Sequence, residues 1–136
     1  MMDDFILIST ETPLISNLNM NENIALIKEF HNHLQRKKAE DIATKYLNKI
    51  NLSRIGLLRL SQCKPIELFY VMYIRALMMP EKNLVIVSPF NIIRNVKNMQ
   101  DVIENLEILN DNKNILIIDT ITNESRYKGV RCNMIK

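Results

Sequence analysis

Glycine is nearly absent from this chain of 136 residues, which contains only Gly56 and Gly129. Phosphate-binding loops depend on glycine, because the backbone there approaches the phosphates closely or takes a positive φ angle. Neither G-x-x-x-x-G-K-[ST] nor G-x-G-x-x-G can be written with two glycines so far apart. We therefore expect no bound cofactor, since the chain alone cannot hold a nucleotide by either of the usual loops.

Long apolar runs, signal sequences and clustered basic residues are missing as well. No apolar run approaches the roughly 20 residues that cross a bilayer, and the opening Met-Met-Asp-Asp has the wrong charge for a secretory signal. The net charge is +3, but the lysines and arginines are scattered, which is not typical of a nucleic-acid-binding surface. Cys63 and Cys132 belong to no paired motif. We expect a cytoplasmic chain with reduced cysteines that neither spans a membrane nor binds nucleic acid.

Three short apolar runs predict strands: Phe5–Ile8, Asn83–Val87 and Asn114–Ile118. The last two show no alternation of apolar and polar residues, which is typical of strands buried on both faces of a parallel sheet. Between them, residues 96–109 carry apolar side chains at helical spacing and predict the crossover helix that parallel strands require. The tail from Arg126 to Ile135 could add a further short strand.

Three more helices are predicted between the first two strands. Asn19 and Glu22 form a near capping box ahead of the first helix. The second helix covers residues 39–50, and the third begins at Pro65 and is stopped by Pro80. The residues of the first helix that are expected to share one face are Ile24, Ile27, Phe30, His31 and Leu34.

This order of elements indicates an α/β fold in a single domain of residues 1–136. A small mixed domain rarely places three helices between two strands of one sheet, so we expect a small parallel sheet with an inserted helical subdomain. The subdomain covers about residues 19–80, and the sheet core covers residues 1–18 and 81–136.

Short motifs in the right order resemble those of ABC transporter ATPase domains, which have the P-loop NTPase fold. Pro13-Leu14 matches the segment after the family's glutamine, whose place is taken by Thr10, and Glu22-Asn23 matches the next helix start. Arg75-Ala76-Leu77 matches the end of the helix behind the signature motif, and Pro89-Phe90 matches the residues after the Walker B strand. The resemblance covers nearly the whole chain. It implies the C-terminal two-thirds of such a domain, with a partial P-loop NTPase fold and no Walker A motif.

The positions that carry the family's chemistry are altered here. The resemblance places Val87 where the family has the aspartate that helps to hold Mg²⁺, and Ser88 where it has the glutamate that polarises the attacking water. Valine cannot ligate a metal, and serine is far too weak a base to replace a carboxylate. Thr120 stands at the switch-histidine position. Ser61 is nearest to the signature serine, although counting back along the third helix shifts that motif to residues 63–67. We expect no intact catalytic residue and no metal site.

The resemblance implies a degenerate or truncated ATPase-like subunit, a pseudo-enzyme that acts by contacts with a membrane permease or a second ATPase subunit. Two explanations stay open. The chain could be a fragment whose upstream half carries the phosphate loop, in which case ATP and Mg²⁺ would be its cofactors, or a complete degenerate subunit. The alternative function is a stand-alone small α/β interaction or regulatory module unrelated to transport. A phosphate-loop motif encoded in frame before Met1 would favour the transporter interpretation and the fragment explanation.

The resemblance also implies a partner surface at the inner face of the membrane. In the family, the loop after the first strand and the adjacent helical subdomain receive a short coupling helix of the permease. The matching residues are Leu14, Ile15 and Leu18 in the loop and Asn23 in the helix. These apolar side chains suit such a groove, but they would equally suit a small core beneath the loop. The few helices cannot cover both faces and edges of a sheet, so we expect the isolated chain to be marginal or self-associating.

Asp119 follows the third strand, where a carboxylate could accept a phosphoryl group or a metal. A receiver-like site needs a second acid after the first strand, and Ser9-Thr10 supplies none, so a turn-capping role is favoured. Cys63 has no histidine or second cysteine nearby in the sequence and is expected to be inert. His31 and His33 point to different helix faces, which is poor geometry for a metal.

Overall fold

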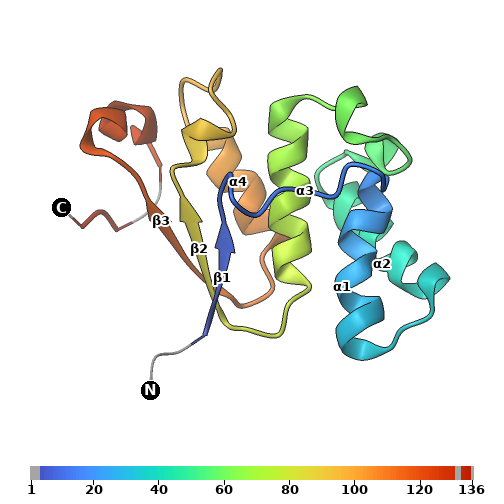
Figure 1. The fold of residues 1–136 in the computed structure, drawn as a ribbon. Helices are drawn as coiled ribbons and strands as arrows, with labels where there is room; N and C mark the ends of the chain where they lie inside the picture. Colours follow the sequence, from blue (N-terminus) through green and yellow to red (C-terminus); the bar gives the residue numbers. More distant parts are fainter. Residues whose placement is uncertain (1–3, 131–132, 136) are drawn as a thin grey trace.

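The computed structural model describes residues 4–130 and 133–135. Its three strands, β1 (Phe5–Ile8), β2 (Asn83–Val87) and β3 (Asn114–Ile118), form a parallel sheet in the order β1-β2-β3. Each strand lies where an apolar run predicts it. The observed sheet confirms the predicted small parallel α/β fold, with the helices gathered behind and beside it (Figure 1).

Four α-helices lie in the described part of the chain. Helices α1 (Met20–Asn32), α2 (Arg36–Lys49) and α3 (Pro65–Leu77) follow β1, and α4 (Gln100–Leu109) connects β2 to β3. Short 3₁₀ helices occupy parts of the connections: η1 (Ser53–Ile55), η2 (Leu60–Gln62), η3 (Pro89–Asn91) and η4 (Ile121–Tyr127).

Local sequence signals explain where the helices begin. Glu22 N–H donates to Asn19 Oδ1 at 2.7 Å and Asn19 N–H donates to Glu22 Oε1 at 2.9 Å, so the predicted capping box is confirmed. Pro65 occupies the first turn of α3, as predicted. Helix α2 begins at Arg36, and the run Arg36-Lys37-Lys38 forms its exposed first turn, as expected of a basic run of good helix formers.

The helices form layers on one side of the sheet. In Figure 1, α4 lies behind the strands and α3 beside them, while α1 and α2 make the far side. Helix α3 contacts β1 and α4 as well as α1 and α2, so it joins the sheet to the outer helices. The buried side chains form one cluster through both regions. The division into a helical subdomain and a sheet core stays a prediction.

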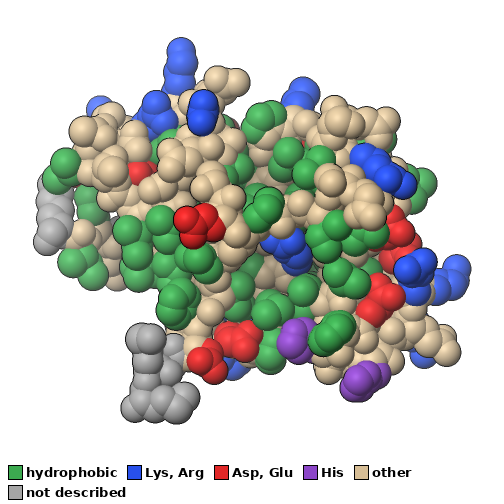
Figure 2. Space-filling view, in the orientation of Figure 1, with side chains coloured by type: hydrophobic (Ala, Val, Ile, Leu, Met, Phe, Trp, Pro, Cys, Tyr) green, Lys and Arg blue, Asp and Glu red, His purple; other side chains and the backbone are tan. Residues whose placement is uncertain are grey.

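The opposite face of the sheet carries no helix among the described residues. Phe5 is 48% exposed, Leu116 53% and Ile118 49%. The expectation that the last two strands are buried on both faces is therefore wrong for β3, because the α-helices pack on one side only. Figure 2 shows apolar side chains gathered over the strands on this side. We call this surface the open face; alternation along the strands assigns to it Phe5, Leu7, Val85, Val87, Leu116 and Ile118.

Two smaller expectations are also wrong. Residues 128–130 and 133–135 form no strand, because the chain turns into η4 after β3; residues 131 and 132 lie outside the described part. Phe30 is 78% exposed instead of facing the core, since the buried residues of α1 all lie in its first half. No helix in the described segments is long and apolar enough to cross a membrane.

Candidate functional site

The carboxyl ends of the parallel strands meet at one edge of the sheet, which is where open α/β sheets place their ligand sites. The strand register brings four of the predicted positions to this edge: Thr10, Val87, Ser88 and Thr120. Ser61 lies elsewhere, in η2 ahead of α3. The catalytic alignments proposed for these five positions stay predictions.

Ser88 has a left-handed backbone conformation at the end of β2, with φ 47° and ψ 60°. This conformation costs roughly 1–2 kcal/mol in a residue with a side chain. Ser88 N–H donates to Ile118 O at 2.8 Å, and Pro89 starts η3 immediately afterwards. The chain therefore turns sharply at Ser88, whose backbone is fixed against the end of β3.

The Asp119 carboxylate organises the segment that follows β3. Its Oδ1 accepts hydrogen bonds from Thr120 N–H at 2.7 Å and from Asn123 Nδ2 at 2.8 Å. Its Oδ2 accepts one from the Tyr127 hydroxyl at 2.7 Å. These bonds confirm the predicted turn-capping role, because the carboxylate holds both ends of η4.

Aromatic contacts that the sequence analysis missed join η4 to η3. The rings of Phe90 and Tyr127 meet edge to face with centroids 5.8 Å apart, and the Arg126 guanidinium lies 4.3 Å from the Phe90 ring centre. The spacing of Asp119, Asn123 and Tyr127 at intervals of four was the only local signal for this arrangement. The segments after β2 and β3 thus form one connected structure at the carboxyl edge.

Arg75 of α3 anchors the loop after β1. Its guanidinium donates to Thr12 O at 2.6 Å and to Pro13 O at 3.0 Å. Burial lowers the pKa of Arg75, because the charged form loses hydration. The loop itself is closed by Ser9 and Thr12, whose side chains bond backbone groups within it, while Thr10 is exposed.

The four residues of the predicted partner surface have different environments. Asn23 is buried, and its side chain accepts from Ile15 N–H at 2.7 Å and donates to the carbonyls of Ile15 at 3.1 Å and Asn19 at 3.0 Å. Leu14 is buried in the main core. Ile15 is 40% exposed and Leu18 half-buried. Only Ile15 and Leu18 therefore present side chains to a partner, and their role stays a prediction.

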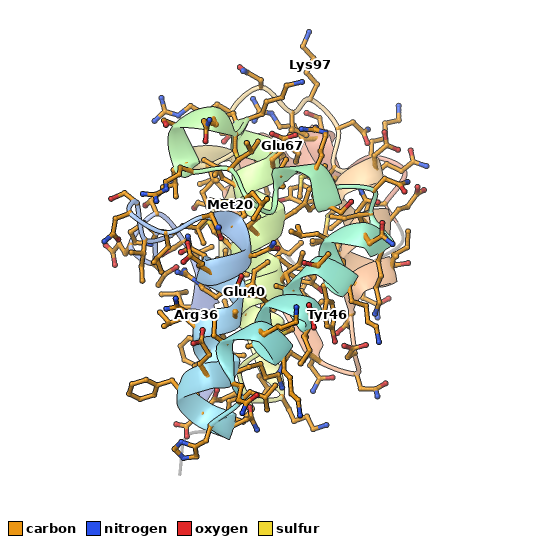
Figure 3. All side chains as sticks on the ribbon, turned by 90° about the vertical axis from the view of Figure 1, so that its right-hand side faces the viewer. Met20, Arg36, Glu40, Tyr46, Glu67 and Lys97 are labelled. Carbon is orange, nitrogen blue, oxygen red and sulfur yellow. The ribbon has the colours of Figure 1, made fainter. Side chains whose placement is uncertain are left out.

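The signature-like segment leads into the start of α3, where Glu67 is labelled in Figure 3. The buried Glu67 accepts from Arg54 Nη2 at 2.5 Å and from Lys64 N–H at 2.8 Å. Burial works to raise the pKa of Glu67, but these hydrogen bonds and positive charges outweigh it, so the pKa lies below its ordinary range. Burial, followed by the Glu67 charge, raises the pKa of Cys63. A raised pKa leaves less thiolate, which agrees with an inert thiol.

Histidine, cysteine and acidic side chains are the residues that could hold a metal ion. Within residues 4–130 and 133–135, no group of three or more histidine, cysteine or acidic side chains could hold a metal ion. His31 and His33 are both exposed, and His33 has a left-handed backbone with φ 54° that ends α1. Cys132 lies outside the described residues.

Comparison with known proteins identifies the architecture. No protein-family model and no curated protein sequence matches the chain. Among solved structures, the dimeric post-hydrolysis state of the ATP-binding cassette MJ0796, bound to ADP and Pi, is similar with a TM-score of 0.63 and 17% identity. The match covers 91% of this chain and 55% of that one, so this chain spans about half of its neighbour. The chain therefore has a partial ABC ATPase-like fold.

Proposed function

We propose that the chain is an ABC ATPase-like unit that does not hydrolyse ATP and acts through contacts with other proteins. The observation that carries this proposal is the chemistry at the carboxyl edge of the sheet. Val87 and Ser88 end β2 there, and Asp119 is the acid that follows β3. Its carboxylate already accepts three hydrogen bonds that shape η4.

Phosphoryl transfer depends on positioned charges, because the protein must hold Mg²⁺ and orient the attacking water. An isopropyl group and a hydroxyl at the end of β2 provide neither a metal ligand of full charge nor a base near neutral pH. The Asp119 carboxylate is directed toward η4, so it does not replace the acids that are missing at the end of β2. The arrangement suits a scaffold better than a hydrolase.

The nucleotide part of the proposal is tested by titrating the purified chain with a fluorescent ATP analogue, with and without Mg²⁺. We expect no saturable, Mg²⁺-dependent binding and no phosphate release above a protein-free blank. Phosphate release that is lost in a Ser88→Ala variant would overturn the proposal, because that result would give the end of β2 a catalytic role.

The partner that we propose is a membrane permease or a second ATPase subunit, reached through the loop after β1. MJ0796 is a dimer in the structure that resembles this chain, which makes a second ATPase subunit a reasonable partner here. The exposed Ile15, beside the half-buried Leu18, supports a contact at this loop. Such a contact would bring the chain to the inner face of the membrane.

The contact is tested by capturing partners from detergent-solubilised membranes with the tagged chain. Ile15→Asp should remove a permease identified by mass spectrometry, while Ile108→Asp, at an exposed position of α4, should not. Leu14 is unsuitable for this test, because a charge in the core would unfold the chain. Equal capture by Ile15→Asp and the unchanged chain would contradict the contact.

A further inference from the structure

Two connecting segments, residues 88–99 after β2 and residues 120–130 after β3, lie side by side beyond the carboxyl edge of the sheet. A backbone N–H at the end of the first segment donates to Arg126 O at 2.7 Å. The Asn98 side chain donates through Nδ2 to Lys128 O at 3.1 Å. The fold therefore brings together two segments that α4 and β3 separate in the sequence.

Four cations lie on these two segments, and we call the surface that they form the basic corner: Arg94, Lys97, Arg126 and Lys128. Three of them are exposed, while the half-buried Arg126 guanidinium lies over the Phe90 ring. Figure 2 shows Lys and Arg side chains gathered at the upper left, over this part of the molecule. Lys97 extends outward from its loop in Figure 3. The fold thus concentrates positive charges that are scattered along the sequence.

Few acidic side chains balance the basic corner. The first segment contains no acidic residue, and the second contains one, Glu124. The Asp119 carboxylate, just before the second segment, accepts three hydrogen bonds within η4. No ion pair between described residues involves any of the four cations. Unbalanced like charges on one surface create a positive potential that attracts polyanions.

The exposed side chains of the first segment indicate which polyanion fits. Each of them is an asparagine, an arginine or a lysine, in the order Asn91, Arg94, Asn95, Lys97 and Asn98. Amide and cationic side chains are the ones that bind phosphate oxygens in protein–nucleic acid complexes. A contact with a membrane surface would use protruding apolar side chains beside the cations, and a contact with an acidic peptide would use an apolar or aromatic anchor. The exposed residues of this segment include neither.

The second segment does contain one strongly exposed apolar side chain, Ile121. It lines a cavity at the outer edge of β3, and none of the four cations takes part in that lining. The apolar surface near η4 is therefore separate from the basic corner.

We propose that the basic corner binds the phosphate backbone of double-stranded nucleic acid, independently of base sequence. Single-strand binding relies on exposed aromatic rings that stack on the bases, whereas here Phe90 is buried and Tyr127 is half-buried against it. The scattered basic residues gave no indication of such a contact, because their gathering depends on the bonds between the two segments. This inference is independent of the proposed ATPase-like function.

The probe is a fluorescein-labelled DNA duplex of about 20 base pairs, whose binding to the full chain is followed by anisotropy. We expect saturable binding with a dissociation constant of about 10–100 μM at about 50 mM salt. The logarithm of the binding constant should fall against the logarithm of the salt concentration with a slope of about −3, since each neutralised phosphate contributes about −0.9. A duplex of unrelated sequence should bind with the same affinity within about twofold, because the phosphates carry no base sequence.

Charge reversal locates the contact on the chain. The paired change Lys97→Glu and Lys128→Glu should weaken binding at least about tenfold and make the salt slope shallower by about two. The matched control is Lys37→Glu with Lys45→Glu, which changes the net charge equally at two exposed positions of α2 and should leave binding within about twofold. Both pairs should unfold at the same urea concentration as the unchanged chain, because none of these lysines forms an ion pair with a described residue.

Several results would overturn the inference. Equal weakening by the two pairs of substitutions would reduce the binding to an effect of net charge. Tighter binding of a single strand of the same length would contradict the preference for a duplex. Tighter binding to polyglutamate, or to vesicles of phosphatidylglycerol, would identify an acidic protein or a membrane as the occupant instead. An affinity that does not depend on salt, or no saturable binding up to about 1 mM, would remove the phosphate contacts altogether.

Discussion

Gly56 lies in close contact with the start of α1. A Cβ atom on Gly56 would lie 2.5 Å from Asn21 Nδ2 and 2.7 Å from Asn21 Oδ1, so any other residue here would have to displace the Asn21 side chain. The two segments are also joined by Asn21 N–H, which donates to Gly56 O at 2.9 Å. The low glycine count predicted the lack of a phosphate loop. The contact between Gly56 and Asn21 joins segments distant in sequence, and no local pattern indicates it.

Glu67 joins the start of α3 to the connection of residues 53–62. Its ionised form stabilises the fold in a defined range of pH. The pKa of Glu67 lies below its ordinary value of 4.5, because the bonds from Lys64 and Arg54 outweigh the effect of burial. A carboxyl group with a lower pKa in the folded chain stabilises the fold above its unfolded pKa. That stabilisation is lost as the pH falls through the folded pKa.

We expect Glu67→Gln to lower the free energy of unfolding by about 1–2 kcal/mol at pH 7, a modest value because Arg54 is largely exposed. The difference from the unchanged chain should shrink below pH 4.5, where the unfolded carboxyl group takes up its proton. Urea unfolding at pH 7, 4 and 3 measures it, with the exposed Glu104→Gln as control. A difference that stays constant over this range would contradict the assignment.

At the scale of elements, short sequence patterns predicted those helix starts and strands that depend on neighbouring residues. The capping box at Asn19, Pro65 in the first turn of α3 and the three apolar runs all lie where the sequence indicates. The one-sided cover of the sheet was not predictable in the same way, because it depends on where the connections carry the helices. The carboxyl edge shows the same division. The positions of Thr10, Val87, Ser88 and Thr120 at this edge follow from the parallel order of the strands. The contact between Phe90 and Tyr127 depends on tertiary packing.

The η4 segment provides a test at this scale. Asp119→Ala removes the acceptor of three hydrogen bonds, so η4 should open more often while the helical layer is unchanged. We expect trypsin to cleave after Arg126 and Lys128 about tenfold faster, which corresponds to roughly 1.4 kcal/mol of local stability. Asp41→Asn, on the exposed side of α2, is the control. Unchanged cleavage with Asp119→Ala would show that the remaining contacts, such as the bond from Met99 N–H to Arg126 O at 2.7 Å, hold η4 without the carboxylate.

For the whole molecule, the dominant feature is a parallel sheet with helices on one face. Parallel sheets are normally covered on both faces, because their strands are apolar on both sides. On the open face, Val85 is the register partner of both Leu7 and Leu116, so apolar surface crosses all three strands. A continuous surface of this kind favours association, whereas single exposed apolar side chains are common and need no partner.

Phe5 and Phe30 allow this distinction to be measured with one kind of substitution. Both are exposed phenylalanines, at 48% and 78%, but Phe5 belongs to the open face and Phe30 lies on the outer side of α1. We expect the chain to self-associate at concentrations of about 100 μM, and Phe5→Lys to raise the dissociation constant about tenfold, because a charge would have to be buried in the contact. Phe30→Lys should leave association unchanged, and both variants should keep the unfolding free energy within about 0.5 kcal/mol. Sedimentation velocity measures the association. A monomer at all concentrations, or an equal effect of the two variants, would show that the open face is stable in water without a partner.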